Sequence, residues 1–285
     1  MSGKILKNIL HRLQGVKPIV EEPIVEEPIV EERLLDGSFR PKIGRPSVAL
    51  FTLHKAGSSF LSERLAPLHK KAGYAVADFE HYLIRLGTPQ SNPFEEEITC
   101  RRIFSAQGVF HKAIRQPIHP DWLGETKVLL VTRDPRDMVT SYYFSLKYSH
   151  VVSSPHVLEQ RRSLENKSID QFVLESELLE TMMRRLEAYR AYFQLGHRFL
   201  HLSYETMVTQ TAIASAQVTS FLGLTSRRAK VFSADDFTVS SEDVMSHRRQ
   251  ILPGDHARKL APETIRRCNE RIRPLASFYG WKNVD

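Results

Sequence analysis

Two short segments rich in anion-binding residues each follow an apolar, strand-like run and open a helix-like stretch. The first, residues 52–60, has the sequence Thr-Leu-His-Lys-Ala-Gly-Ser-Ser-Phe and follows the run 47–51. The second, residues 133–141, has the sequence Arg-Asp-Pro-Arg-Asp-Met-Val-Thr-Ser and follows the run 127–132. A strand, an anion-binding turn and a helix, repeated in one chain, predict a fold that holds a ligand with phosphate-like groups at both ends.

The first segment has the residue types that an anion site at a helix N-terminus needs. A helix that begins near Ser58 leaves backbone N–H groups unpaired and carries a partial positive charge at this end. Gly57 allows a close approach of the backbone, Lys55 adds a full charge and Ser59 adds a hydroxyl donor. The lysine precedes the glycine, so the segment does not match the G-x-x-x-x-G-K-[ST] motif of P-loop proteins. A serine-capped turn without a ligand is the alternative.

The second segment predicts a different kind of anion contact. Arg133 ends an apolar strand, where open α/β sheets bind ligands, and its planar fork suits a phosphate. Asp134 and Pro135 suit the N-cap and the first turn of a helix. Ser141 follows about two helical turns after Arg133 and is expected to face the same anion. The alternative is a capped helix with solvated arginines, which applies most strongly to Arg136.

Together the two segments resemble the sulfotransferase family that uses 3′-phosphoadenosine 5′-phosphosulfate (PAPS) as its sulfuryl donor. Residues 52–60 are similar to the 5′-phosphosulfate loop of this family, and residues 133–141 to its 3′-phosphate motif. The resemblance extends over about residues 48–221. It implies an α/β fold with a parallel central sheet flanked by helices on both faces, related to the P-loop NTPases. It also implies an enzyme that binds the product 3′-phosphoadenosine 5′-phosphate (PAP) without a metal.

The resemblance implies a role for each residue that matches a family motif. Lys55 would contact the bridging oxygen of the donor and assist the leaving group. The remaining matches would bind the nucleotide: Ala56, Gly57, Ser58 and Ser59 at the 5′-phosphate, Arg133 and Ser141 at the 3′-phosphate, and Phe60 and Tyr204 beside the adenine.

The third family motif is only partly present. Members carry a basic pair, a glycine and a Gly-Asp-Trp stretch, whereas residues 247–256 read His-Arg-Arg-Gln-Ile-Leu-Pro-Gly-Asp-His. The basic pair and the Gly-Asp pair are kept, but glutamine replaces the first glycine and histidine replaces the tryptophan. The resemblance implies that Arg248 and Arg249 bind the 3′-phosphate. A solvated basic loop is the alternative.

Transfer to a hydroxyl also calls for a base that removes the proton of the acceptor. Histidine suits this task because its unperturbed pKa lies near neutrality. His111 ranks first, because it ends a predicted strand and its separation from Arg133 is similar to that in cytosolic members. Glu80 ranks second, because membrane-bound relatives use a glutamate after the phosphosulfate loop, and His81 ranks third. His54 is expected to donate to the ligand or to pack.

The composition predicts one soluble domain at residues 41–285. The chain has 285 residues, of which 41% are apolar and 26% charged, as in ordinary globular proteins. No stretch approaches the roughly 20 apolar residues that span a bilayer, and basic residues interrupt the N-terminal segment. We therefore expect a cytoplasmic enzyme without a transmembrane segment. A net charge of +7 suits an anionic donor and is compatible with an acidic glycan or lipid as the acceptor.

The first 40 residues are expected to form a separate segment. Residues 18–32 are three copies of Pro-Ile-Val-Glu-Glu. Regular prolines interrupt a helix and paired glutamates repel, so we predict a disordered or extended spacer. Residues 1–17 are basic and place apolar side chains on one helical stripe. They could contact a membrane or a partner, and the alternative is a frayed tail with an accidental pattern.

Alternating strand and helix patterns independently predict a parallel sheet covered on both faces. The regions 87–106 and 150–167 lack clear periodicity and are expected to form acceptor-binding or lid loops. The expected strands are 47–53, 74–78, 107–112, 127–132 and 198–203, and the main helices are 58–72, 79–86, 135–149, 168–178, 179–195, 211–222 and 262–279.

Two other functions compete with sulfuryl transfer to a carbohydrate, lipid or small-molecule hydroxyl. A nucleoside or small-molecule kinase should have a lysine after the glycines and an acidic magnesium site, and the sequence has neither in the expected context. A basic module that binds nucleic acid would account for the net charge. It would not account for two anion motifs placed after strands, so we expect no nucleic-acid partner.

Overall fold

The computed structural model of the protein describes residues 29–88, 92–149, 155–223, 231–238, 242–246 and 249–284, without the side chains of residues 155 and 156. The amphipathic segment 1–17 and the first two pentapeptide repeats lie outside these ranges. Within them, no helix is both long enough and apolar enough to cross a membrane.

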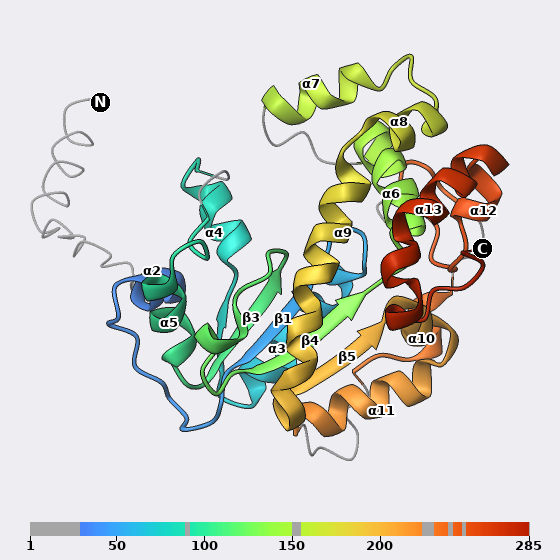
Figure 1. Ribbon diagram of the computed structural model, residues 1–285. Helices are drawn as coiled ribbons and strands as arrows, with labels where there is room; N and C mark the ends of the chain where they lie inside the picture. Colours follow the sequence, from blue (N-terminus) through green and yellow to red (C-terminus); the bar gives the residue numbers. More distant parts are fainter. Residues whose placement is uncertain are drawn as a thin grey trace, which may run out of the picture.

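Five parallel strands form the centre of the protein (Figure 1). β1 (Val48–Thr52) lies in the middle, between β3 (Val109–Ile114) and β4 (Lys127–Thr132). β2 (Ala75–Ala77) and β5 (Phe199–Ser203) form the two edges, so the order is β2-β3-β1-β4-β5. β1 is buried along its whole length, as expected for a strand covered on both faces. The predicted α/β fold is confirmed.

Helices cover one face of the sheet with a compact apolar cluster. Leu61 and Leu65 of α3 pack with Val48 and Leu50, the alternate residues of β1 that point to this face. The other helices of this layer follow β5 and contribute Met207 and Val218 to the cluster. The bounds are α3 Ser58–Lys71, α10 Tyr204–Thr209 and α11 Thr211–Leu222.

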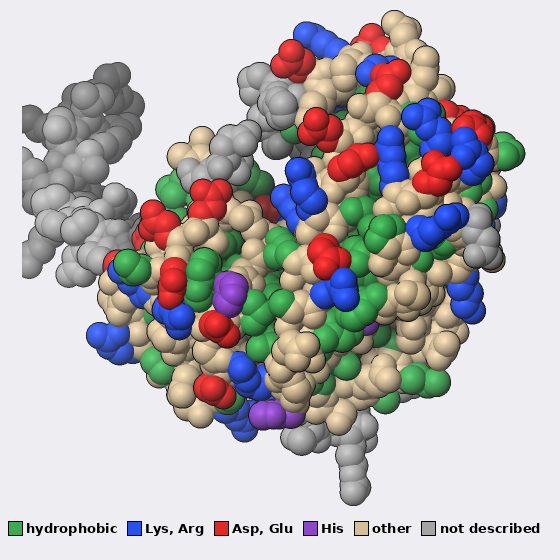
Figure 2. Space-filling model, viewed as in Figure 1, with side chains coloured by type: hydrophobic (Ala, Val, Ile, Leu, Met, Phe, Trp, Pro, Cys, Tyr) green, Lys and Arg blue, Asp and Glu red, His purple; other side chains and the backbone are tan. Residues whose placement is uncertain are grey.

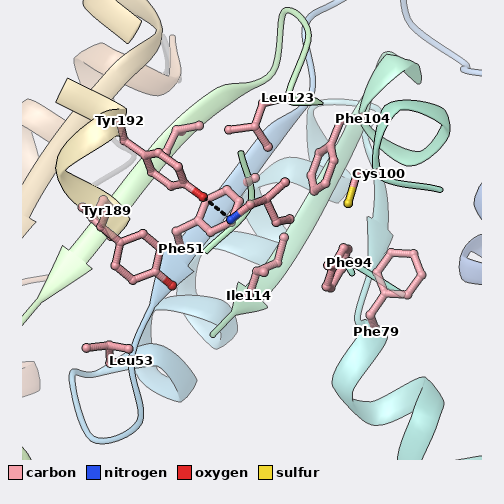
Figure 3. Close-up of a cluster of buried hydrophobic side chains, with 14 of the residues drawn as sticks. Phe51, Leu53, Phe79, Phe94, Cys100, Phe104, Ile114, Leu123, Tyr189 and Tyr192 are labelled. Atoms are coloured by element: carbon pink, nitrogen blue, oxygen red, sulfur yellow. Dashed lines mark hydrogen bonds between the residues drawn. The ribbon is translucent and has the colours of Figure 1, made fainter. Parts of the chain in front are cut away.

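The opposite face has a larger cluster rich in aromatic rings (Figure 3). Phe51 of β1 lies edge-on to Tyr192, with ring centroids 5.0 Å apart. The hydroxyl of Tyr192 accepts the backbone N–H of Ile118 at 2.8 Å, so its polar end is satisfied inside the core. The helices here are α2 Val30–Leu35, α4 Phe79–Arg85, α5 Glu97–Ser105, α6 Pro135–Phe144, α9 Leu178–Tyr189 and α13 Pro262–Tyr279.

Two predicted loop regions contain helices. α5 lies in the region 87–106 and buries Cys100, Ile103 and Phe104 on one side. α7 (Pro155–Ser163) lies in the region 150–167. Both are nine residues long, which is too short for a helical period to be distinct in sequence. The remaining helices are α8 Ile169–Glu175 and α12 His256–Lys259, and a π-helical turn, Ser145–Ser149, continues α6.

The folded part of the chain begins before residue 41, which differs from the predicted spacer. α2 contains the end of the third pentapeptide repeat and buries Leu34 to 1% exposure in the aromatic core. The carboxylate of Glu31 accepts the backbone N–H of Asp78, the N-cap of α4, at 2.5 Å. Arg-Leu-Leu follows the third repeat in place of another proline, so a helical turn can form at residues 30–35 and dock.

Candidate functional site

A cavity of about 700 Å³ lies where the strands end. The loop after β1 contributes Lys55, and the residues that directly follow β3, β4 and β5 contribute Arg115, Arg133 and Tyr204. This is the edge at which parallel α/β sheets bind ligands. The cavity brings together most of the residues proposed from the sequence: Lys55, Gly57, Ser58, Ser59, Phe60, Glu80, Arg133, Ser141, Tyr204 and Arg249.

The loop between β1 and α3 turns sharply at two residues with positive φ, Lys55 at 67° and Gly57 at 88°. A lysine in this region is uncommon and strained. A Cβ atom on Gly57 would lie 3.1 Å from Met207 and 3.2 Å from Tyr204, so only glycine fits. Ala56 is fully buried within the loop and does not line the cavity.

The first turn of α3 opens onto the cavity with its backbone donors exposed to a ligand. α3 begins at Ser58, and its N-cap is Gly57, which has no side chain to accept the first N–H groups. Ser58 and Ser59 both line the cavity. Uncapped N–H groups, a helix dipole and two hydroxyl groups together make a site for anionic oxygen atoms.

Lys55 lies in a strongly positive environment. Burial, together with the charges of Arg133, Arg249 and Arg115, lowers the pKa of its ammonium to about 8. Each of these effects disfavours the charged form when no anion is near. An anionic ligand in the cavity would reverse the charge effect.

Arg133 supplies the second anion-binding point. Its side chain is only 4% exposed, its Nη1 donates to the backbone oxygen of Lys55 at 3.0 Å, and its guanidinium lies 4.2 Å from the ring centre of Tyr204. An ion pair with Asp137, at 3.6 Å, is long. Among the described residues, the buried Nε of Arg133 has no hydrogen-bond partner. Because buried donors are normally paired, this nitrogen fits a site that is completed by a ligand.

Asp137, in α6, anchors the third motif to this point. Its buried carboxylate accepts the backbone N–H groups of Gly254 at 2.7 Å and His256 at 2.9 Å, and lies 2.6 Å from Nδ1 of His256. Burial raises the pKa of Asp137, but the hydrogen bonds of His256 and the charge of Arg133 outweigh it, so the pKa is lowered overall. A role for Asp137 could not be inferred from the sequence, because these hydrogen-bond partners lie over a hundred residues away.

Arg249 lines the cavity but shares its charge with two carboxylates. It forms ion pairs with Glu242 and Asp255, and its guanidinium lies 4.1 Å from the ring centre of Phe144. The Gly-Asp pair of the third motif therefore positions the arginine through Asp255. Arg248 lies outside the described residues.

Aromatic side chains form another part of the wall. Phe60 lies 5.0 Å from Phe237, measured between ring centres, and both line the cavity. The hydroxyl of Tyr204 donates to the backbone oxygen of Ile251 at 2.8 Å, which fixes its ring beside Gly57. Flat apolar rings of this kind suit a planar base. Phe237 was not identified from the sequence, since it lies in a short turn without a motif.

His111, the first-ranked base, does not reach the cavity. Its ring is 0% exposed, with centroids 5.0 Å from Phe104 and 6.4 Å from Phe79, and neither nitrogen has a partner. Burial lowers the pKa of this histidine to about 3, so it is neutral. β3 continues to Ile114, which places His111 in the middle of the strand and inside the core. The assignment of His111 as base is therefore corrected.

Glu80 does line the cavity, in the first turn of α4, and forms an ion pair with Arg115. His81 is exposed, and its backbone N–H donates to the capping carboxylate of Asp78 at 3.1 Å. His54 lines the cavity with its ring 6.1 Å from that of Tyr142. Of the three base candidates, the structure brings only Glu80 to Lys55 and Ser58.

Arg115 is the main cavity residue that the sequence analysis missed. It follows the apolar end of β3 as Arg133 follows that of β4, so the same position rule could have found it.

On the outer face shown in Figure 2, basic and acidic side chains are interspersed. The cavity, by contrast, gathers Lys55, Arg115, Arg133 and Arg249. Among the described ranges, no group of three histidine, cysteine or acidic side chains is placed to bind a metal.

Comparisons with known proteins agree with the fold described above. Mouse sulfotransferase SULT7A1 complexed with PAP is similar at 15% identity, over 87% of this chain and 94% of that chain, with a TM-score of 0.52. Retinol dehydratase in a complex with retinol and PAP is similar at 14% identity, over 86% and 84%, with a TM-score of 0.56. These likenesses show a shared fold. A search of curated proteins finds no significant match. The sulfotransferase domain family matches residues 45–251, most of the chain, and the chain therefore belongs to that family.

Proposed function

We propose that the protein transfers the sulfuryl group of PAPS to the hydroxyl group of an acceptor. The observation that carries the proposal is a single cavity with two separate anion-binding points. One consists of Lys55 and the uncapped start of α3, and the other includes Arg133 with its unpartnered Nε. A phosphosulfate and a 3′-phosphate on one adenosine match two such points, and the rings of Phe60 and Phe237 suit the adenine.

The residues of the cavity would divide the chemistry between them. The donor supplies the sulfuryl group, and the bond between sulfur and the bridging oxygen breaks as a bond from the acceptor oxygen to sulfur forms. Lys55 would stabilise the electron pair that remains on the 5′-phosphate oxygen. Glu80 would accept the proton of the acceptor hydroxyl, a contribution of about 10²- to 10⁴-fold for a positioned base. Arg133, Ser141 and Arg249 would hold the 3′-phosphate.

The acceptor would approach from the part of the wall that contains Glu80, Tyr142 and Leu146. This wall mixes a carboxylate, a phenol and an aliphatic side chain. Such a lining supports a hydroxyl group carried on a partly apolar acceptor, whether a small molecule or the end of a glycan or lipid.

Two measurements on the full chain test the proposal. Calorimetry is expected to show binding of PAP without added metal, and ATP with magnesium should bind far more weakly. Transfer of label from radiolabelled PAPS to a panel of hydroxyl acceptors is expected to stop in the Lys55→Ala variant. That variant should still fold and bind PAP, because Arg133 and the α3 backbone donors remain. Folded protein that gives no heat with PAP would falsify the proposal.

A further inference from the structure

Arg115 has contacts that its position in the fold does not require. Its side chain is 17% exposed and lines both the main cavity and an adjoining one of about 180 Å³. Its Nη2 donates to the hydroxyl of Ser58 at 3.2 Å, and its Nη1 pairs with the carboxylate of Glu80. Its Nε is buried, and no residue in the described part of the chain accepts a hydrogen bond from it. The guanidinium of Arg115 thus contacts both Ser58 of the loop after β1 and the proposed base Glu80. Its Nε–H can still donate to a ligand.

Arg115 also shares its space with Lys55. Its charge contributes to the lowered pKa of that lysine, as do the charges of Arg133 and Arg249. The guanidinium groups of the other two arginines, Arg133 and Arg249, lie over the rings of Tyr204 and Phe144. Arg115 instead contacts Ser58, at the start of α3, and Glu80, the proposed base. Two cations facing one partly buried space are unfavourable until an anion lies between them.

We propose that Arg115 binds the sulfuryl oxygens of the donor and, through its ion pair, orients Glu80 toward the acceptor hydroxyl. This inference rests on the proposed function. A planar guanidinium presents donors in a fixed fork, which suits the oxygens of a tetrahedral anion better than an ammonium does. These oxygens keep their charge while the group is transferred. Arg115 therefore holds sulfur in line between the bridging oxygen and the acceptor oxygen.

A purely structural role of Arg115 predicts a different effect on the affinities for PAPS and PAP. If Arg115 only ties α3 to α4, its loss loosens Ser58 and Glu80 together and weakens every nucleotide that uses the loop. If it binds the sulfuryl group, its loss weakens PAPS but not PAP, which has no sulfur. The ratio of the two affinities separates these roles.

The experiment compares PAPS and PAP binding by calorimetry, without acceptor, in the wild-type protein and in Arg115→Lys. The lysine keeps the charge and removes the fork. We expect PAPS affinity to fall roughly tenfold or more, as for a lost charge-assisted fork, and PAP affinity to stay within about twofold. The matched control is Arg266→Lys, an exposed arginine of α13 with its own carboxylate partners, which should change neither affinity.

The other possible results of this experiment would each overturn a specific part of the proposal. Equal losses for PAPS and PAP, or no loss in a folded variant, would overturn the sulfuryl contact. A wild-type protein that binds neither nucleotide would instead overturn the proposed function. The Glu80→Gln background separates direct from indirect action: the PAPS loss on Arg115→Lys should persist there. If it disappears, Arg115 acts only by positioning Glu80, and the direct contact is wrong.

Discussion

Lys55 combines two features that a lysine in an ordinary surface loop lacks. Its backbone has a positive φ of 67°, and its ammonium is partly buried and feels the charges of three arginines. The strained backbone is held by its surroundings, since the carbonyl oxygen of the same residue accepts Nη1 of Arg133. The sequence could identify this lysine by its place before Gly57. It could not show that the arginines, from three distant segments, surround it.

The pH dependence of PAP binding follows from this environment. Burial and the neighbouring cations lower the pKa of Lys55 to about 8, and an anionic ligand favours the charged form and raises it again. We therefore expect Lys55 to take up protons when PAP binds near and above pH 8, and the affinity for PAP to fall as pH rises further. Calorimetry in two buffers of different ionisation enthalpy measures this uptake.

A Lys55→Arg variant provides the control for this effect, because a guanidinium stays charged throughout the range. Its PAP affinity should depend less on pH than that of the wild type, and its proton uptake near pH 8 should be lost. Proton uptake of equal size in both proteins would show that another group titrates, and the assignment to Lys55 would fail.

At the scale of single elements, the ends of the strands decide where the chemistry lies. The strands predicted at 47–53, 127–132 and 198–203 agree closely with β1, β4 and β5, because apolar runs are a clear signal for buried strands. β3 was predicted to end at residue 112, but pairing with β1 extends it to Ile114 past two polar residues. Because the strand was predicted to end too early, His111 was expected at the cavity although it lies in the core. For the same reason, Arg115 was not recognised as the residue that follows the strand.

α6 depends on Asp137 in a way that can be measured. We expect Asp137→Asn to lower the free energy of unfolding by about 2 to 4 kcal/mol, because an amide cannot accept all the donors that the carboxylate does. PAP affinity should also fall, since residues 254–256 lose their attachment beside Arg249. Urea unfolding near neutral pH gives the first quantity and calorimetry the second.

The same variant has a pH signature with a definite sign. The folded-state pKa of Asp137 is lowered, so its stabilisation is present above the unfolded value of about 3.9 and is lost as pH falls below it. The stability difference between wild type and Asp137→Asn should therefore shrink below about pH 4. A difference that stays constant down to pH 3 would contradict the role of this charge.

At the scale of the whole molecule, the C-terminus is locked to the start of α6. The guanidinium of Arg136, 2% exposed, donates to Asp134, to Asn269 of α13 and to the backbone oxygens of Lys282 and Asn283. The sequence analysis left Arg136 without a role and favoured solvation. Its partners come from the last part of the chain, and no local pattern indicates such a contact. The overall fold was predictable from apolar runs, whereas these long-range locks were not.

The Arg136→Met substitution should therefore lower the stability of the whole molecule, which should still unfold in a single transition. It leaves the carboxylate of Asp134 and several buried acceptors unpaired, and we expect a loss of about 3 to 5 kcal/mol in the free energy of unfolding. Arg266→Met, which removes an exposed arginine with two carboxylate partners, should change it by less than about 1 kcal/mol. Urea denaturation followed by tryptophan fluorescence compares the two, in a Trp122→Phe background so that the signal comes from Trp281. Because Trp281 stacks on Tyr279 at 5.1 Å just before the locked residues, its signal should change in the same transition as the backbone signal from circular dichroism. An earlier fluorescence change with Arg136 intact would mean that the C-terminus opens on its own, and Arg136 would then stabilise only that end.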